Sequence, residues 1–308
     1  MGLNGIILIN KERGISSNSV VNKVKHILKA DKAGHLGTLD VLGEGLLPVT
    51  LGKCTKLFDF YLNKDKVYKT IFKFGETTDT LDLEGEVTLK NDVIVTKEKL
   101  NSIIPQFIGE QNQLPPQYSA KKINGQKAYD LARKGIENIE LKPKLIHIYS
   151  IKILSQIDAN VFELEIHCSS GTYIRSICRD MATKLSTYGV MLKIIRTRCA
   201  DFDISNSYTL QDLKNGNYKI ITVQELFDYP SINLDDNETN KILNGININY
   251  PKDGFYKLFN NNKFLGLVNV TDNKMRFTLR CVWFYTFFKL KTYFYLLYAY
   301  FLLIRKLN

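Results

Sequence analysis

The sequence is poor in residues that bind metals or form disulfide bonds. It has 308 residues but only five cysteines and four histidines. The cysteine count is odd and no pair has Cys-x-x-Cys spacing, which argues against a disulfide framework and a structural zinc site. The histidines also lack the spacing of a metal-binding pair. We therefore expect no metal site.

The N-terminus lacks the features of a secretory signal. No basic segment precedes its apolar stretch, and that stretch, Ile6–Ile9, is short. Gly5 and Asn10 bound it, which is typical of a first strand. We expect a cytoplasmic protein.

Acidic residues are outnumbered by basic ones. The chain has 42 Lys and Arg against 31 Asp and Glu, a formal charge of +11. Hydrophobic residues make up 44%, which excludes a largely disordered chain. A polyanion is a reasonable partner, although net charge describes attraction and not chemistry.

The hydrophobic pattern predicts mixed strands and helices without strict alternation, and therefore an α+β fold. Residues 34–52 are rich in glycine and are predicted to be mainly loop. The predicted strands cover residues 6–9, 67–75, 145–154, 161–168, 255–259 and 264–269. The predicted helices cover residues 19–29, 97–108, 128–134, 172–185 and 239–245.

The C-terminal residues 281–304 differ from the rest in their density of aromatic side chains. Lys289 and Lys291 interrupt them, and the uninterrupted part, 293–304, is shorter than the about 20 residues that span a bilayer. We hypothesise that residues after about Phe277 are not native domain sequence. The predicted division is a larger domain at 1–228, a small β-rich domain at 229–278 and a tail at 279–308.

Three segments carry residues suited to catalysis. Asp40 follows a glycine-flanked His35, and its carboxylate could serve as nucleophile or base. Arg175 lies where a strand passes into a helix, and it could pair with such a carboxylate. Tyr68 lies on an alternating strand. The alternatives are a turn cap at Asp40, a surface arginine and ordinary sheet packing.

Taken together, the segments resemble the TruB family of tRNA pseudouridine synthases. The resemblance starts from GHLGTLDVLGEGLLPVTLGKCTKL at residues 34–57. The other matching segments are KERGIS at 11–16, KVYK at 66–69, residues 107–135, CSSGTYIRSICRD at 168–180 and IIRTR at 194–198. Order and spacing match over about residues 5–202.

The resemblance implies isomerisation of uridine 55 in the T-arm of tRNA to pseudouridine. This reaction involves no redox change or phosphate transfer, so we expect no cofactor or metal, and we expect a monomer because RNA is the partner that needs the surface. It implies a catalytic domain with a central mixed, mainly antiparallel sheet flanked by helices. It also implies a small PUA-like RNA-binding domain, here shortened at its C-terminal end.

The resemblance also implies roles for individual residues. Asp40 matches the nucleophile, Arg175 its arginine partner, and Tyr68 a tyrosine that stacks on the flipped base and takes part in proton transfer. His35 matches a histidine that fills the space the base vacates. Further pocket residues would be Tyr173 and Ile195. The positive charge of their segments, and not the resemblance, suggests RNA-backbone contacts by Lys121, Lys122, Arg196 and Arg198.

The chain departs from the family pattern close to the nucleophile. Val41 replaces a proline, which predicts a looser loop, and Glu44 adds a negative charge where RNA phosphates should pass. Ser170 replaces a lysine, which removes one phosphate contact. These departures predict lower turnover and affinity, not a different reaction.

Three other functions remain open from the sequence. One is a catalytically weak member of the family that acts as a tRNA-folding chaperone. Another is a member of the guide-RNA-dependent branch of the superfamily, against which residues 107–135 argue. The third is a membrane-attached RNA-binding protein that uses the aromatic tail.

Overall fold

The computed structural model describes residues 3–118, 122–123, 126–127 and 141–281. It divides the chain into two compact units between Ile221 and Thr222, and each unit is described here by itself. The predicted helix at 128–134 and the tail beyond Cys281 lie outside the described residues.

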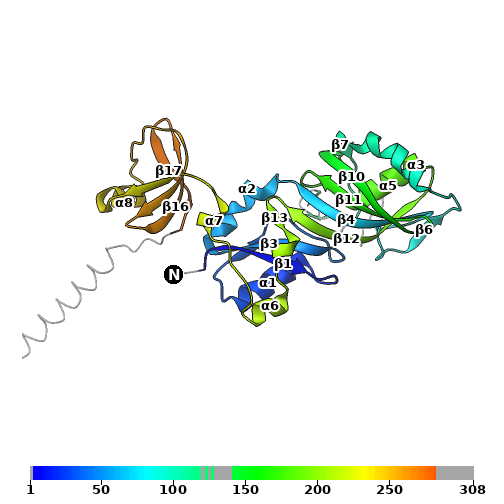
Figure 1. Ribbon diagram of the computed structural model, residues 1–308, viewed down its shortest axis with the longest axis horizontal. Helices are drawn as coiled ribbons and strands as arrows, with labels where there is room; N and C mark the ends of the chain where they lie inside the picture. Colours follow the sequence, from blue (N-terminus) through cyan, green and yellow to red (C-terminus); the bar gives the residue numbers. More distant parts are fainter. Residues whose placement is uncertain (1–2, 119–121, 124–125, 128–140, 282–308) are drawn as a thin grey trace, which may run out of the picture. The chain divides into compact units, whose positions relative to one another are not determined.

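The first unit is built on a nine-stranded sheet with the central order β1-β3-β12-β4-β11-β10-β7 (Figure 1). All neighbours are antiparallel except β3 and β12, which are parallel, so the sheet is mixed. Off this path, β2 pairs with β3 and β13 pairs with β12. The strands are β1 (Gly5–Lys11), β2 (Ala33–His35), β3 (Glu44–Leu51), β4 (Lys66–Phe74), β7 (Gly109–Gln113), β10 (Lys144–Asp158), β11 (Val161–Cys168), β12 (Gly189–Cys199) and β13 (Phe202–Asp203).

Helices and two small hairpins complete this unit. The hairpins pair β5 (Glu76–Thr78) with β6 (Val87–Lys90) and β8 (Lys122–Ile123) with β9 (Gln126–Lys127). The α-helices are α1 (Ser17–Ile27), α2 (Phe58–Leu62), α3 (Lys97–Ile103), α5 (Ile174–Lys184) and α6 (Leu210–Lys214). Short 3-10 helices are η1 (Gly52–Leu57), η2 (Ile104–Phe107) and η3 (Ile204–Asn206).

Two apolar clusters fix the helices on the sheet. α3 and α5 pack against β4, β10 and β11, whose alternate residues such as Phe72, Phe162 and Leu164 are fully buried. α1 and α6 pack at the other end of the sheet, against β1 and β3 (Figure 1). This alternation is why the predicted strands at 67–75 and 161–168 are present as β4 and β11.

The glycine-rich segment 34–52, predicted as mainly loop, is loop at 36–43 but strand at 44–51. It contains β2 and β3, and β3 lies between β1 and β12 with Leu46 to Leu51 buried on both faces. A strand covered on both faces loses the polar–apolar alternation that reveals a half-exposed one. The prediction was therefore wrong here.

The predicted helices match with shifted ends. Ser16 caps α1 by accepting a hydrogen bond from the backbone N–H of Ser19 (3.1 Å). The helix predicted at 97–108 ends at Ile103 and continues as η2, which contains Pro105. The helix predicted at 172–185 is α5.

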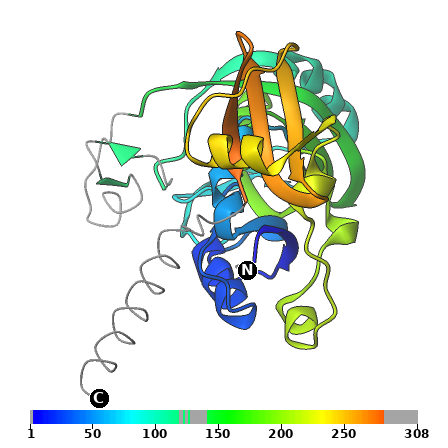
Figure 2. The same cartoon turned by 90° about the vertical axis from the view of Figure 1, so that its left-hand side faces the viewer.

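The second unit holds a four-stranded sheet in the order β14-β15-β16-β17, with α8 packed on it (Figure 2). Asp235 and Glu238 form a capping box that starts α8. Sequence analysis missed β14 and β17, and the predicted boundary at 278 cuts through β17, where Leu279 is buried. The elements are α7 (Val223–Leu226), β14 (Ser231–Leu234), α8 (Asp236–Leu243), β15 (Gly254–Asn260), β16 (Lys263–Thr271) and β17 (Lys274–Arg280).

Across the described ranges, no helix combines the length and apolar character needed to cross a membrane.

Gly14 and Gly45 both have a left-handed backbone, but a side chain would collide with a neighbouring strand only at Gly45. Gly14 (φ +84°) has open space around it, whereas a Cβ at Gly45 (φ +93°) would lie 2.5 Å from the carbonyl oxygen of Arg196. We expect Gly14→Ala to lower the free energy of unfolding by about 1–3 kcal/mol, the strain alone. Gly45→Ala should cost clearly more in urea denaturation, because β3 and β12 must separate. Equal losses would contradict this assignment.

Candidate active site

A cavity of about 460 Å³ opens beside the loop between β2 and β3. Segments distant in sequence meet there because β4, β12 and the start of α5 converge on that loop. The cavity is lined by His35, Gly37, Thr38, Leu39, Asp40, Gly43, Phe58, Lys66, Tyr68, Pro115, Lys144, Ser170, Gly171, Thr172, Tyr173, Ile174, Arg175, Met191, Ile194 and Arg196.

The loop that carries Asp40 is anchored from both sides. The hydroxyl of Ser17 in α1 bonds both the N–H (2.8 Å) and the carbonyl (2.7 Å) of Leu39. On the sheet side, the guanidinium of Arg196 donates to the carbonyls of Gly37 (3.0 Å), Thr38 (3.3 Å) and Leu46 (2.8 Å). These bonds fix the backbone while the Asp40 side chain stays 56% exposed to the cavity.

Lys11 holds the turn that follows Asp40. Its buried ammonium donates to the carbonyls of Glu12 (3.0 Å), Val41 (3.2 Å) and Gly43. Burial lowers the pKa of Lys11 from 10.5 to about 8, opposed by the nearby carboxylates of Asp40 and Glu44. The Gly14 N–H donates to the same Val41 carbonyl (2.9 Å).

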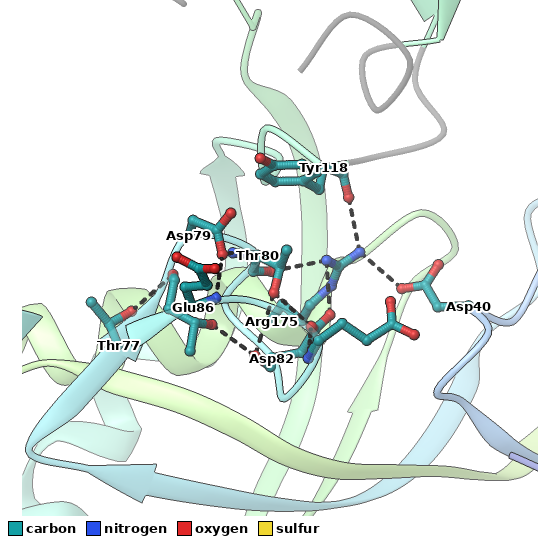
Figure 3. A network of polar contacts seen from close by, with 10 residues as sticks. Asp40, Thr77, Asp79, Thr80, Asp82, Glu86, Tyr118 and Arg175 are labelled. Atoms are coloured by element: carbon teal, nitrogen blue, oxygen red, sulfur yellow. Dashed lines mark hydrogen bonds and ion pairs between the residues drawn. The ribbon is translucent and has the colours of Figure 1, made fainter. Parts of the chain in front are cut away.

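Arg175 is a buried cation shared by two carboxylates (Figure 3). One terminal nitrogen bonds Asp40 Oδ2 (2.9 Å) and the Tyr118 carbonyl (3.0 Å). The other bonds the Thr80 carbonyl (2.9 Å) and lies 3.1 Å from Asp82 Oδ2. With donors occupied on both sides, the guanidinium has one orientation and aims one edge at Asp40.

Asp82 is the site residue that sequence reasoning missed. It is buried and lies in the turn between β5 and β6, where it also accepts from Thr80 Oγ1 (2.7 Å) and the Glu84 N–H (3.0 Å). Several acids and threonines share this turn, so the sequence alone offers no signal that distinguishes Asp82. The fold does so by placing α5 beside it.

Tyr68 on β4 and His35 on β2 line the cavity as uncharged side chains. Tyr68 is 8% exposed, and burial raises the pKa of its phenol far above its usual range, so it stays protonated. Burial, with the Arg196 charge, lowers the pKa of His35 below 6.5. The Gly37 N–H donates to His35 Nδ1 (3.3 Å), which leaves the proton of the neutral ring on Nε2.

Tyr173 is positioned by a buried amide. The side chain of Gln113 accepts from the Tyr173 N–H (2.8 Å) and donates to its carbonyl (3.1 Å). Ile195, predicted to line the pocket, does not; its neighbour Ile194 does. Side chains alternate along β12, so Ile194 and Arg196 face the cavity and Ile195 faces the opposite side, near Gly45.

The predicted RNA-backbone residues have different environments. Arg196 is fully buried on carbonyls of the Asp40 loop, so it is a structural residue and that prediction was wrong. The side chain of Arg198 is 43% exposed and lies 3.5 Å from Asp65 and 3.4 Å from His167. Lys122 lies in β8, and Lys121 lies outside the described residues.

Side chains that can bind metal ions, among them the buried thiols of Cys168 and Cys178, occur within the described ranges. No three His, Cys, Asp or Glu side chains there form a possible metal site. Burial raises the pKa of Cys168 to about 12, and Cys178 is raised as well, so neither is a thiolate at neutral pH.

Comparison with known proteins decides the family. The chain matches the TruB family pseudouridylate synthase (N terminal domain) over residues 25–174 and the Pseudouridine synthase II TruB, C-terminal, over 230–276. The tRNA pseudouridine synthase B of Caldanaerobacter subterraneus subsp. tengcongensis is 38% identical over 281 residues, 90% of this chain and 98% of the relative. That of Clostridium acetobutylicum is 41% identical over 281 residues, 88% and 96% of the two chains.

The chain belongs to the TruB family. Solved structures agree with the fold. A Cbf5-Nop10-Gar1 complex has a chain with TM-score 0.63 and 22% identity, covering 87% of this chain and 78% of that one. An H/ACA RNP bound to a substrate RNA containing 2'-deoxyuridine gives 0.61 and 20%, covering 90% and 83%. At these identities the likeness concerns the fold alone.

The departures from the TruB pattern are accommodated locally. Val41 lacks the rigidity of proline, but its carbonyl accepts from Gly14 and Lys11, which hold the loop. Glu44 lies 3.9 Å from Lys193, which offsets its charge. At Ser170, the exposed Lys144 of β10 reaches the cavity mouth and donates to the Ser170 carbonyl (3.2 Å). Its Nζ crosses Gly171, where any Cβ would collide with it.

The buried Lys11 predicts a pH-dependent stability. Between about pH 8 and 10.5 the unfolded chain keeps the Lys11 proton and the folded chain releases it. The unfolded state then binds more protons, so stability rises with pH. Relative to Lys11→Met, we expect the wild type to gain up to about 3 kcal/mol across this window in urea denaturation. Parallel pH profiles of the two proteins would contradict the burial of a charged Lys11.

Proposed function

We propose that this TruB protein is a tRNA pseudouridine synthase, an isomerase that converts uridine 55 of the T-arm to pseudouridine. The observation that carries the proposal is the Asp40–Arg175 ion pair at the edge of a cavity walled by Tyr68, Met191 and Ile194. Relatives that align over nearly their whole length are tRNA pseudouridine synthases B.

The reaction requires the uracil to leave the RNA stack, because its glycosidic bond must break and the ring must rotate. The cavity supplies an apolar enclosure for that ring. Tyr68 is the aromatic wall on which the flipped base stacks, and Tyr173 and Ile194 close the pocket around it. Neutral His35 occupies the space that the base leaves in the RNA.

Asp40 acts at C1′ of the target nucleotide. Arg175, fixed by Asp82 and the Thr80 carbonyl, orients the Asp40 carboxylate toward the cavity. Cleavage of the C1′–N1 bond proceeds either by attack of the carboxylate on C1′ or through a glycal intermediate. After rotation, C5 bonds to C1′, and any bond between C1′ and the Asp40 carboxylate breaks. C5 loses its proton to the phenol oxygen of Tyr68 as that phenol gives up its own proton, and N1, freed from C1′, ends with a proton. The atoms balance without a cofactor.

The surrounding residues serve the RNA. Lys144 and Arg198 are the exposed cations that we assign to phosphates, with Lys121 and Lys122 as further candidates. The unit from Thr222 onward is proposed as the PUA-like RNA-binding domain. We also propose a monomer, because RNA is the partner that needs the surface, and we propose that it acts on tRNA in the cytoplasm.

Mapping pseudouridine on unmodified tRNA tests the function. We expect the wild type to give a carbodiimide-dependent stop at position 55. Asp40→Ala should abolish it, a loss of more than about 10³-fold, because no other carboxylate among the described residues lines the cavity. The control is Asp92→Ala, an exposed carboxylate that does not line the cavity.

The same variants separate catalysis from a chaperone function. If Asp40→Ala makes no pseudouridine but still promotes tRNA folding, the wild type has both activities. A folded wild type that modifies another uridine, or none, would overturn the proposed reaction.

Lys144 should contribute one phosphate contact. Lys144→Ala is expected to weaken tRNA binding and to reduce the slope of log Kd against log salt by about one. Lys97→Ala, an exposed lysine on α3 that does not line the cavity, is the matched control. Measured Kd values from 50 to 300 mM salt decide the point, and unchanged slopes for both variants would exclude Lys144 from the contact.

A further inference from the structure

Phe58 has no role in the reaction described so far, yet it lines the cavity. It is the first residue of α2 and is 40% exposed. Single exposed apolar side chains are common on protein surfaces and mean little by themselves. Phe58 differs because its ring borders the cavity that is proposed to receive an RNA nucleotide.

The packing of α2 keeps Phe58 at the mouth. Leu57 and Tyr61, on either side of it in sequence, are 5% and 3% exposed, and the Tyr61 ring packs on Phe202 (ring centroids 5.4 Å apart). The helix is therefore anchored through these neighbours. The Phe58 ring stays outward instead of collapsing into the core.

Tyr68 and Phe58 differ in exposure within the same cavity, which assigns their rings to different nucleotides. Tyr68 is 8% exposed and lies on a central strand, next to the residues proposed for bond cleavage. Phe58, with 40% exposure, borders the outer part of the same cavity. A base that reaches Tyr68 leaves its neighbour in the RNA chain close to the cavity mouth.

We infer that Phe58 is a stacking platform for the base of the nucleotide adjacent to the target uridine. The inference rests on the proposed function and adds a second base contact to it. Aromatic rings stack on any base, since each base has a π-face, so the contact gives affinity and registration without reading sequence. The exposed ring is covered by RNA only when the target base occupies the inner pocket.

Substitutions on α2 test the contact. We expect Phe58→Ala to lower kcat/KM on a T-arm stem-loop about fivefold to tenfold, at the lower end for loss of base stacking because the ring is partly covered by protein. Phe58→Trp should retain wild-type activity and Phe58→Leu should not. The matched control is Phe60→Ala, because Phe60 is 46% exposed on the same helix but does not line the cavity. Equal activity of Phe58→Leu and wild type would overturn the inference.

Abasic substrates identify the partner base. Two stem-loops, each lacking the base on one side of the target uridine, are compared with the intact RNA. On the RNA that lacks the stacked base, Phe58→Ala and wild type should have equal kcat/KM, whereas the other RNA should keep the difference. The full difference on both abasic RNAs would show that Phe58 acts without a neighbouring base, and would overturn the inference.

Binding measurements keep this test separate from the proposed function. If the wild type makes no pseudouridine at position 55, the reaction fails, but the stacking contact can still be measured as Kd. Phe58→Ala should then bind the intact stem-loop more weakly than Phe60→Ala, with equal thermal unfolding temperatures of the two variants. Equal Kd values would overturn the stacking contact.

Discussion

The site depends on the two ion pairs that the guanidinium of Arg175 makes. The guanidinium is buried between the carboxylates of Asp40 and Asp82, and breaking such a pair would leave an uncompensated charge in a poorly solvated position. Asp82 satisfies the side of the cation that points away from the cavity, and Asp40 receives the other side. The planar guanidinium, held by the β5–β6 turn, therefore fixes the orientation of the Asp40 carboxylate.

The central sheet explains why the remaining site residues meet. β4 and β12 are neighbours, and their alternation sends Tyr68, Ile194 and Arg196 to one face. Arg196 donates hydrogen bonds to carbonyls of the Asp40 loop, and Tyr68 and Ile194 form the wall of the cavity. One face of two strands thus provides both the support and the lining of the pocket, whereas Arg198 and His167 lie around a separate cavity of about 270 Å³.

Sequence reasoning identified what depends on local pattern and missed what depends on contacts between distant segments. β4, β11 and α5 were predictable because one face of each is apolar. β3 was not, since burial on both faces removes that signal. The sequence prediction placed Ile195 in the pocket, but its neighbour Ile194 lines it, because adjacent residues of a strand face opposite sides. Arg196 was taken for an RNA contact because its charge suggests exposure, and only the fold reveals the three carbonyls that make its burial possible.

The Ser17 hydroxyl ties α1 to the loop that carries Asp40. It bonds both polar groups of the Leu39 backbone, and Leu39 directly precedes Asp40. α1 also carries basic residues at its far end, Lys25 and His26, in its last turn. One short helix thus carries basic side chains at one end and, at the other, the hydroxyl that anchors the backbone next to Asp40.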